Sequence, residues 1–513
     1  MDVRTLMRRS AQFHADQIAV VEGDTRLTFN EAWTRGIRMA NALLSLGLEP
    51  GDRIGVLEDN TFESVDLFCG AAAANLVRVP LYPRNSRQAH RHMLEHTACR
   101  AVVVSQSHAQ ALAGIDSEID SIEHIIVRDD DYETWLAGFD DTDPEPAVHE
   151  DDWFIIRHTG GTTGRSKGVA YTHKTWLDAG RDWFYAFPPV QKGDVCQHAG
   201  PISHGSGYFF TPMWLSGGVN LLIKNFEPAE VVATMEREHV AYGFLIPTML
   251  NAIAREETAS TRDWSHLKVL QIGGSPIADD TALLGRDVFG DVLYQGYGQT
   301  EAVPITMMGP NEWFSEVSGS NPLRSAGRPL PFGDLAIVDP DTHAELPLGS
   351  EGEIAIRCDG QMLGFWGDDV ATAERMNDGW VLSGDIGLLD TNGYLYVLDR
   401  KDDLIISGGF NIWPAELENV LTGHPDVIEA AVFGVPDERW GESPYGVVTV
   451  TENAAVTADE LIELCAHRLG SYKKPAGIEL TTEPLPKSPV GKLARKQLRE
   501  PHWQGHDRRV AGN

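Results

Sequence analysis

Short apolar runs and helical repeats alternate along the first 400 residues of the chain. Apolar residues between positions 32 and 44 recur at helical spacing, which predicts a helix there. Helical patterns of this kind separate most of the apolar runs, and such alternation is typical of mainly parallel sheets flanked by helices. The runs that predict buried strands are Leu76–Leu81, Ala101–Val104, His124–Val127, Phe154–Ile156, Gly243–Ile246 and Val269–Ile272.

The pattern changes near residue 400. Two predicted strands, Tyr394–Leu398 and Leu404–Ile406, are separated by the charged turn 399–403. The residues beyond this turn form a compact α+β pattern that ends near residue 500, and the polar tail from Pro501 is expected to be loose. We therefore predict an α/β protein with a large N-terminal domain over residues 1–400, built of subdomains, and a small α+β domain over residues 401–513.

Composition and charge limit the classes of function. At about 150 residues per domain, 513 residues correspond to about three domain-sized units. The 42 Lys and Arg residues are outnumbered by 75 Asp and Glu residues, giving a net charge of −33. This charge argues against a general binder of nucleic acid or of anionic membranes. Small anionic ligands remain compatible with it, provided that dedicated loops and a few local cations hold them.

Cysteine spacing and hydropathy favour a cytosolic protein. The five cysteines lie far apart and form no Cys-x-x-Cys pair, which predicts reduced thiols and no zinc cluster. The first residues lack the apolar segment of a signal peptide, and no apolar run approaches the length of a membrane span.

A glycine-rich segment, Thr159–Gly168, follows the predicted strand Phe154–Ile156. Its four glycines allow several backbone N–H groups to face one anion, and its hydroxyls and two cations add donors. It is not a Walker A loop, because Ser166 precedes Lys167 and a glycine follows them. A flexible surface turn is the alternative, which the density of hydroxyls and cations disfavours.

This segment resembles the signature loop of the adenylate-forming superfamily, which includes acyl-CoA synthetases, firefly-luciferase-like enzymes and peptide-synthetase adenylation domains. Serine is frequent in the family at the position of Gly160, so one hydroxyl donor is missing here. Four further motifs follow in the family's order and, with the loop, span most of the chain. They are Gly273–Pro276, Tyr297–Glu301, Ser383–Asp385 with Asp399 and Arg400, and Pro489–Lys492.

The resemblance implies an ATP-dependent carboxylic acid:CoA ligase that forms an acyl-adenylate and pyrophosphate, and then acyl-CoA and AMP. It implies catalytic roles for Lys492, Thr300, Glu301 and His204, with Glu301 as the ligand of Mg²⁺. The residues that it implies for ATP and AMP binding are Thr159, Gly160, Gly161, Thr162, Thr163, Gly164, Lys167, Gly274, Ser275, Pro276, Gln295, Gly296, Tyr297, Gly298, Thr300, Asp385, Arg400 and Lys492. Outside this family context, Glu301, Arg400 and Lys492 would be ordinary solvated charges.

The acyl pocket implied by the resemblance is mostly apolar. Its residues are His204, Gly205, Gly207, Ile246, Gly273, Gly298, Val303 and Pro304. Amino-acid-activating relatives hold the substrate's amino group with an aspartate near His204, but residues 202–210 contain no acidic side chain. We therefore predict an aromatic, alicyclic or medium-chain acid, and the sequence does not rank these three classes. The alanine-rich segment Gly70–Ala74 is expected to serve helix packing.

The resemblance also implies a mobile C-terminal domain that turns about a hinge at Asp402 and offers a second face to CoA. The predicted CoA contacts are Ser407, Gly408, Gly409, Trp440, Tyr472, Lys474 and Arg84. The alternatives are a core position for Trp440 and a solvated turn for residues 472–475. Transfer to a carrier protein or another acceptor, a catalytically inactive nucleotide-binding module and a homodimer also stay open, although the presence of Lys492 and Glu301 disfavours the inactive module.

One motif competes with this interpretation. His92–His96 fits the His-x-x-Glu-His pattern of inverted zinc proteases, and a helix would place both histidines on one face. A polar helix before the strand Ala101–Val104 is the favoured interpretation, because the adenylation motifs already account for the chain.

Overall fold

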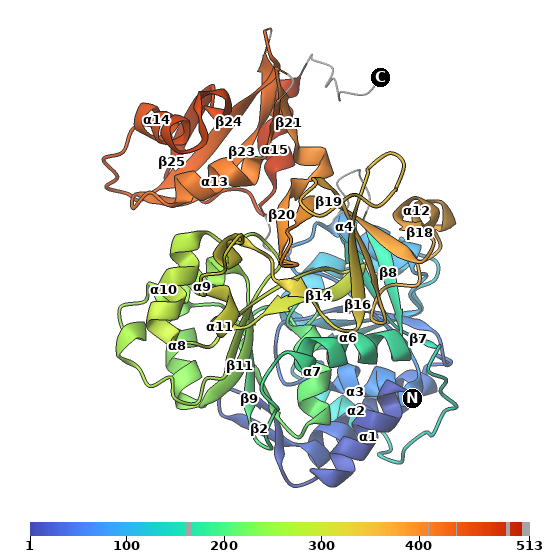
Figure 1. The fold of residues 1–513 in the computed structure, drawn as a ribbon. Helices are drawn as coiled ribbons and strands as arrows, with labels where there is room; N and C mark the ends of the chain where they lie inside the picture. Colours follow the sequence, from blue (N-terminus) through green and yellow to red (C-terminus); the bar gives the residue numbers. More distant parts are fainter. Residues whose placement is uncertain (160–165, 409, 438, 489–492, 505–513) are drawn as a thin grey trace.

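The computed structural model describes residues 1–159, 166–408, 410–437, 439–488 and 493–504. Figure 1 shows a large body that carries the N-terminus and a smaller unit, formed by the orange and red C-terminal elements, at one end of it. Sheets and helices make up both parts. The predicted α/β class, with a large N-terminal domain and a smaller C-terminal domain, is confirmed.

A six-stranded sheet occupies the first part of the chain, with the strand order β6-β5-β3-β4-β7-β8. Neighbouring strands are parallel except for the hairpin of β7 and β8. The strands are β3 (Arg53–Leu57), β4 (Val77–Pro80), β5 (Ala101–Ser105), β6 (His124–Arg128), β7 (Trp153–Thr159) and β8 (Lys167–Thr172). Four of the predicted apolar runs lie in this sheet.

A nine-stranded sheet follows, with the order β15-β14-β13-β12-β11-β9-β10-β1-β2. Its centre is parallel, and antiparallel strands close both edges. The strands are β1 (Ile18–Glu22), β2 (Thr25–Thr28), β9 (Val195–His198), β10 (Val219–Leu222), β11 (Val240–Leu245), β12 (Val269–Ile272), β13 (Leu293–Gln299), β14 (Ala302–Met308) and β15 (Arg328–Pro329).

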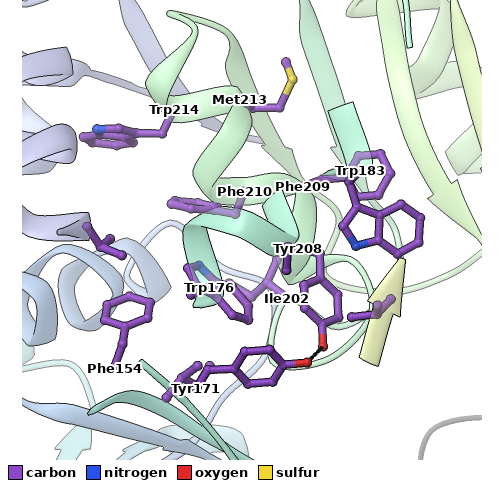
Figure 2. Close-up of a cluster of buried hydrophobic side chains, with 14 of the residues drawn as sticks. Phe154, Tyr171, Trp176, Trp183, Ile202, Tyr208, Phe209, Phe210, Met213 and Trp214 are labelled. Carbon is purple, nitrogen blue, oxygen red and sulfur yellow. Dashed lines mark hydrogen bonds between the residues drawn. The ribbon is translucent and has the colours of Figure 1, made fainter. Parts of the chain in front are cut away.

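Helices fill the space between these two sheets and form an aromatic core. α6 (His173–Tyr185) and α7 (Gly207–Leu215) contribute Trp176, Trp183, Phe209 and Trp214, which pack with residues of both sheets. Figure 2 shows these rings crowded around α7, with the Tyr171 and Tyr208 hydroxyls in contact. α8 (Pro228–Arg237), α9 (Pro247–Ala254) and α10 (Asp279–Phe289) cover the opposite face of the nine-stranded sheet.

The alanine-rich helix α3 (Ser64–Ala74) is buried along its whole length against α2 (Phe29–Ser45). The two helices meet at glycines: a Cβ on Gly36 would lie 2.2 Å from Cβ of Cys69, and one on Gly70 would lie 2.9 Å from the Gly36 oxygen. Only glycine permits this approach. The expectation that Gly70–Ala74 serves helix packing is confirmed.

A third sheet, of five strands, is antiparallel throughout and was not predicted by the parallel pattern. Its strands are β16 (Gly333–Val338), β17 (Gly352–Cys358), β18 (Met376–Asn377), β19 (Trp380–Leu389) and β20 (Leu395–Arg400). β19 and β20 are joined by a short turn at residues 390–394, which suits an antiparallel hairpin. This sheet carries the motif formed by Ser383–Asp385, Asp399 and Arg400 toward the nine-stranded sheet.

The C-terminal domain is built on a sheet of β21 (Ile405–Ser407), β22 (Phe410–Ile412), β23 (Val427–Asp437), β24 (Gly441–Val450) and β25 (Gly477–Thr481). α13 (Pro414–Thr422) and α14 (Ala458–Leu469) pack on it, and α15 (Arg495–Arg499) follows the last motif. The expectation of a tail that is loose from Pro501 is wrong for its first residues. The Trp503 indole N–H donates to the Gly434 oxygen at 2.9 Å, and His502 packs on Phe433 and Tyr445.

All five cysteines are free, and four of them are buried, as the sequence predicted for reduced thiols. Across the described ranges, no helix is both long enough and apolar enough to span a membrane.

His198, at the end of β9, is a buried imidazole that the core holds neutral. Its Nε2 lies 2.8 Å from Asn220 Oδ1, and its Nδ1 lies 2.8 Å from the Ser206 hydroxyl. Burial lowers the pKa of His198 to about 4. Because this folded value lies below the unfolded pKa of about 6.5, the unfolded chain takes up the proton first as the pH falls.

We therefore expect His198 to weaken the fold at acidic pH. The contribution of His198 to the free energy of unfolding should be complete above pH 6.5. It should fall by up to about 1.4 kcal/mol per pH unit as the pH decreases toward 4. Urea unfolding of the wild type and of His198→Gln between pH 7.5 and 4.5 measures this. The variant should be less stable at pH 7.5 and less dependent on pH, whereas equal pH slopes would contradict the assignment.

Candidate active site

Asp385, on β19, is the centre of a buried polar cluster where two of the sequence motifs meet. The Tyr297 hydroxyl on β13 donates to Asp385 Oδ2 at 2.6 Å, and the Gln299 amide donates to the same oxygen. Arg400, at the end of β20, places its Nε 2.9 Å from Asp385 Oδ1. The antiparallel register of β19 and β20 pairs Asp385 with Arg400 directly. The third sheet thus delivers both residues to the end of β13.

The cluster fixes the charge state of its members. Burial, followed by the negative charge of Asp385, raises the pKa of the Tyr297 phenol well above its usual range, so this residue stays a hydrogen-bond donor. Burial alone would lower the pKa of Arg400, but Asp385, Tyr297 and Glu301 reverse this and raise it. Asp385 is itself only 5% exposed, and its carboxylate is acceptor-only, which suits hydroxyl groups of a ligand.

Sequence reasoning missed two members of this site, Gln299 and Arg375. Arg375, at the end of α12 (Asp369–Arg375), donates to the Ser383 oxygen at 2.7 Å and to the Gln299 side chain at 3.2 Å. The same Nη2 atom lies 3.9 Å from Glu301 Oε1, linking the Asp385 cluster to Glu301. Gln299 occupies the variable position of its motif. Arg375 belongs to no motif, so only the fold reveals it.

Glu301 is the one acidic residue predicted to hold a metal. It is 8% exposed, and its oxygen lies beyond hydrogen-bond distance from Arg375. Within the described residues, no group of three or more His, Cys, Asp or Glu side chains is arranged to hold a metal ion. A single carboxylate fits Mg²⁺, which commonly keeps waters and takes its other ligands from substrate phosphates. Beside Glu301, the backbone carbonyl of Thr300 accepts from the Tyr171 hydroxyl.

The predicted phosphate loop joins β7 to β8. Thr159 and Lys167 pair across this hairpin, so the loop starts and ends at one place on the six-stranded sheet. Lys167 Nζ lies 5.1 Å from the centroid of the Phe365 ring. The central loop residues Gly160, Gly161, Thr162, Thr163 and Gly164 lie outside the described residues.

The predicted adenine turn follows β12 and adjoins the aromatic-Gly motif of β13. β12 and β13 are parallel neighbours, with Ile272 opposite Gln295. Gly274 has a φ of +86°, which favours glycine, and Ser275 and Pro276 are exposed beside it. A Cβ on Gly273 would lie 3.0 Å from the Gly296 oxygen. These residues lie at the carboxyl ends of parallel strands, where open α/β sheets usually bind ligands.

Two of the residues predicted for the acyl pocket, Gly205 and Gly273, adjoin Phe244, which sequence reasoning did not single out. A Cβ on Gly205 would lie 2.8 Å from the Phe244 ring, and one on Gly273 would lie 3.7 Å from it. The rings of His204 and Tyr82 meet edge to face at 5.3 Å. Four other predicted residues, Ile246, Gly298, Val303 and Pro304, lie on or beside β11, β13 and β14. Gly207 faces the Ile202 carbonyl so closely that chain packing alone accounts for it.

The predicted CoA residues form an exposed aromatic surface on the C-terminal domain. Trp440 is 47% exposed and covers Gly408, whose amide donates to the Trp440 oxygen at 2.8 Å. Tyr472 is also exposed and packs on Phe410, which pairs with Ser407. This exposure is inconsistent with Trp440 as a core anchor.

The two predicted CoA cations lie on the surface. Lys474 forms an ion pair with Glu463 at 3.2 Å, and Arg84 is exposed in the segment before α4 (Arg87–His96). Gly409 lies outside the described residues.

Arg495 forms ion pairs with acidic residues around the predicted hinge. Asp402 lies in the short 3-10 helix Lys401–Asp403, and Arg495 of α15 reaches both sides of it. Arg495 binds Glu418 through two contacts of 2.7 and 2.6 Å and lies 3.2 Å from Asp403 and 3.4 Å from Asp399. Burial raises the pKa of Asp399 to about 6. The predicted catalytic Lys492, three residues before Arg495, lies outside the described residues.

The histidines of the competing zinc motif lie beside the phosphate hairpin. His92 and His96 stack at 5.6 Å, and His96 Nδ1 lies 3.4 Å from His158 Nε2 on β7. His92 Nε2 also lies 2.9 Å from the Ser166 oxygen. Burial, followed by the two neighbouring histidines, lowers the pKa of His158 to about 3. His158 is therefore neutral, and it packs beneath the hairpin on the side of α4.

Comparisons with known proteins agree with this geometry. The family model "AMP-binding enzyme" matches residues 7–366, and "AMP-binding enzyme C-terminal domain" matches residues 416–492. The chain is 34% identical over 495 residues to a feruloyl-CoA synthase of Amycolatopsis sp, covering 96% of this chain and 97% of the relative. It is 30% identical over 522 residues to the fatty acid–[acyl-carrier-protein] ligase ScoC of Streptomyces coeruleorubidus, covering 99% and 98%.

Solved structures show the same fold. ATP-bound MatB from Rhodopseudomonas palustris superposes with a TM-score of 0.89 at 25% identity, covering 99% of this chain and all of that one. The match extends through both domains, as do the family models. The chain therefore belongs to the adenylate-forming superfamily and, within it, to the AMP-forming acyl-CoA synthetases.

Proposed function

We propose that this acid:CoA ligase activates an aromatic, alicyclic or medium-chain acid in two half-reactions. In the first, a carboxylate oxygen bonds to the α-phosphorus of ATP and the bond to pyrophosphate breaks. In the second, the CoA thiol loses its proton, its sulfur bonds to the acyl carbon, and AMP leaves. The observation that carries the proposal is the buried cluster of Tyr297, Asp385 and Arg400, which Arg375 links to Glu301.

The chain's residues divide the first half-reaction between them. Asp385 accepts hydrogen bonds from the ribose hydroxyls, while the Thr159–Gly168 hairpin and Lys167 hold the β- and γ-phosphates. Thr300 donates to the α-phosphate, where charge builds up during the transfer. Glu301 would hold Mg²⁺, which when bound offsets phosphate charge. Lys492 supplies a further cation between the acyl oxygen and the α-phosphate.

The acyl pocket supports an apolar substrate. Phe244 adjoins Gly205 and Gly273, and Trp183 meets Phe244 edge to face at 6.2 Å. No acidic residue occurs between Ile202 and Phe210 to hold an amino group. The feruloyl-CoA and fatty-acid relatives named above are consistent with ring and chain acids respectively. An amino-acid substrate is therefore disfavoured.

A carrier protein is the alternative acceptor, because the fatty acid–[acyl-carrier-protein] ligase is a full-length relative. The exposed Trp440 favours CoA, since a flat ring beside a glycine turn offers a stacking surface for the adenine of CoA. The two acceptors can be compared directly with one acid, using CoA in one reaction and a phosphopantetheinylated carrier protein in the other.

A panel of acids tests the whole proposal. Each acid is incubated with ATP, Mg²⁺ and CoA, and both AMP and thioester are measured. We expect aromatic, alicyclic or medium-chain acids to yield the two products in equal amounts, and amino acids to yield neither. Failure of every acid to produce AMP would overturn the proposed reaction, and AMP without thioester would point to another acceptor.

Replacing Trp440 by alanine should weaken CoA binding alone. Stacking of an aromatic ring on a base typically contributes about 1–3 kcal/mol, so we expect the KM for CoA to rise about tenfold or more. Pyrophosphate release in the absence of CoA should stay nearly normal. Phe13→Ala, which removes another exposed aromatic ring on α1 (Val3–Phe13), is the control. An unchanged KM for CoA would remove Trp440 from the CoA site.

A further inference from the structure

Arg157, on β7, is a fully buried arginine. It lies two residues before Thr159 and is 1% exposed. Among the described residues, its one hydrogen bond runs from Nη2 to the Ser203 backbone oxygen at 3.2 Å, and Nε and Nη1 are buried with no partner. Within the described residues, no carboxylate forms an ion pair with it. Burying an unpaired charge is costly, so such a group calls for a missing partner.

The other buried arginines of this sheet also have guanidinium nitrogens without hydrogen-bond partners, but each of them lies beside a carboxylate. Arg78, on the neighbouring strand β4, lies 3.5 Å from Glu58, and Arg128 lies 2.8 Å from the same carboxylate. Arg78 is directly opposite Ile155 in the register of β4 and β7. Glu58 therefore supplies a counter-charge to Arg78 and Arg128, whereas no carboxylate of the described ranges pairs with Arg157.

Aromatic rings accommodate the Arg157 side chain without neutralising it. The guanidinium carbon lies 4.4 Å from the centroid of the Tyr208 ring and 5.8 Å from that of Trp176. Figure 2 shows these two rings beside one another, with the Tyr208 hydroxyl directed toward Tyr171. Ring faces attract a cation but carry no net charge. The rings therefore leave the positive charge of Arg157 to be balanced by an anion from outside the protein.

The anion can be identified by what surrounds the guanidinium. Ser203, the hydrogen-bond partner of Arg157, immediately precedes His204, at the acyl pocket. Tyr208 touches Tyr171, whose hydroxyl donates to the backbone carbonyl of Thr300, the residue proposed to contact the α-phosphate. Arg157 thus lies between the residues proposed to flank the acid substrate and those proposed to flank the α-phosphorus that the acid attacks.

We propose that Arg157 binds the carboxylate of the acid substrate and orients it for attack on the α-phosphorus. The assignment rests on the proposed acid:CoA ligase reaction and adds the residue that recognises the reacting group. The free Nε and Nη1 atoms provide donors for carboxylate oxygens, and the carboxylate supplies the missing negative charge. Once the acyl-adenylate has formed, the carboxylate charge is gone, and the AMP half of the molecule holds the intermediate.

Because the carboxylate charge is present only before the adenylate forms, loss of Arg157 should affect the first half-reaction and not the second. For an acid that the panel identifies as a substrate, Arg157→Met should raise the KM for the acid about 10- to 100-fold in ATP–pyrophosphate exchange. The KM for ATP should change by no more than about twofold. Thioester formation from supplied acyl-adenylate and CoA should stay close to normal. Arg157→Lys, which keeps the charge but loses the planar donor set, should give an intermediate KM for the acid.

Arg78→Met is the matched control, because Arg78 is equally buried but already paired with Glu58. It should lower both half-reactions together, in step with any loss of folded protein. Arg157→Met would overturn the proposal if it behaved in the same way, or if it raised the KM for ATP instead of that for the acid. The second outcome would assign Arg157 to a phosphate.

A measurement on the wild-type enzyme guards against a variant that fails to fold. Two competitive inhibitors are compared: the neutral amide of the substrate acid and a non-reacting acid of the same shape. The inhibition constant of the amide should be at least about tenfold higher than that of the acid. Equal inhibition by the two compounds would overturn the assignment. Failure of the proposed function is recognised separately, because the wild-type enzyme would then form no AMP with any acid.

Discussion

Replacing Lys492 by alanine is expected to abolish acyl-adenylate formation while sparing thioester formation from supplied acyl-adenylate. A preorganised cation at the place where charge builds up typically accounts for a factor of about 100 to 1000 in rate. The described residues on either side of Lys492 contact one another. Lys487 pairs with Leu493 across an isolated bridge, and the Ala494 amide donates to the Pro486 oxygen at 2.8 Å. ATP–pyrophosphate exchange measures the first step, and thioester release from the adenylate measures the second.

The contrast between the two steps is the informative result. If Lys492 serves one face of a C-terminal domain that turns about Asp402, only the step performed with that face should suffer. Lys496→Ala, on the adjacent helix α15, removes a neighbouring cation and should leave both steps intact. Equal loss of both steps in Lys492→Ala would contradict the two-face arrangement. Loss in Lys496→Ala as well would favour a general effect of the basic helix.

Strands buried on both faces were predictable from the sequence, because an uninterrupted apolar run leaves little choice of structure. The run Val269–Ile272 is β12 itself, and Ala101–Val104 falls one residue short of β5; both strands are buried throughout. The third sheet was harder to predict. β19 carries Ser383, Gly384 and Asp385 in its middle, and these residues resemble a turn. Their polar side chains serve the site, so local propensity and final structure disagree there.

The residues of the site also include some that the sequence could predict and some that it could not. Residues within contiguous motifs, such as Tyr297 and Asp385, could be predicted, and the fold brings these two together across 88 positions. Arg375, Phe244 and Arg157 could not, since each gains its meaning from a contact between separate elements. Arg157 looks like an ordinary charge in an apolar strand until its burial and its missing counter-charge are known. Periodicity locates strands, but it does not say which side chains converge.

Replacing Asp385 by alanine should impair both half-reactions, unlike the loss of Lys492. The change removes the acceptor proposed for the ribose and leaves Tyr297, Gln299 and Arg400 without their shared carboxylate in a buried site. Hydrogen bonds to a charged group contribute about 1.5–3 kcal/mol each, so we expect the KM for ATP to rise at least about 100-fold. The AMP portion stays bound in both steps, so thioester formation from the adenylate should fall as well.

A matched carboxylate separates this binding role from a structural one. Asp390, in the turn between β19 and β20, also accepts several hydrogen bonds, from Ser320, Tyr394 and Tyr396. Asp390→Ala should lower the unfolding temperature without raising the KM for ATP of the enzyme that remains folded. Asp385→Ala should raise that KM even where its unfolding temperature matches that of the Asp390 variant. Identical kinetics in the two variants would mean that Asp385 only stabilises the packing of the two sheets. The ribose of the nucleotide would then need another hydrogen-bond acceptor.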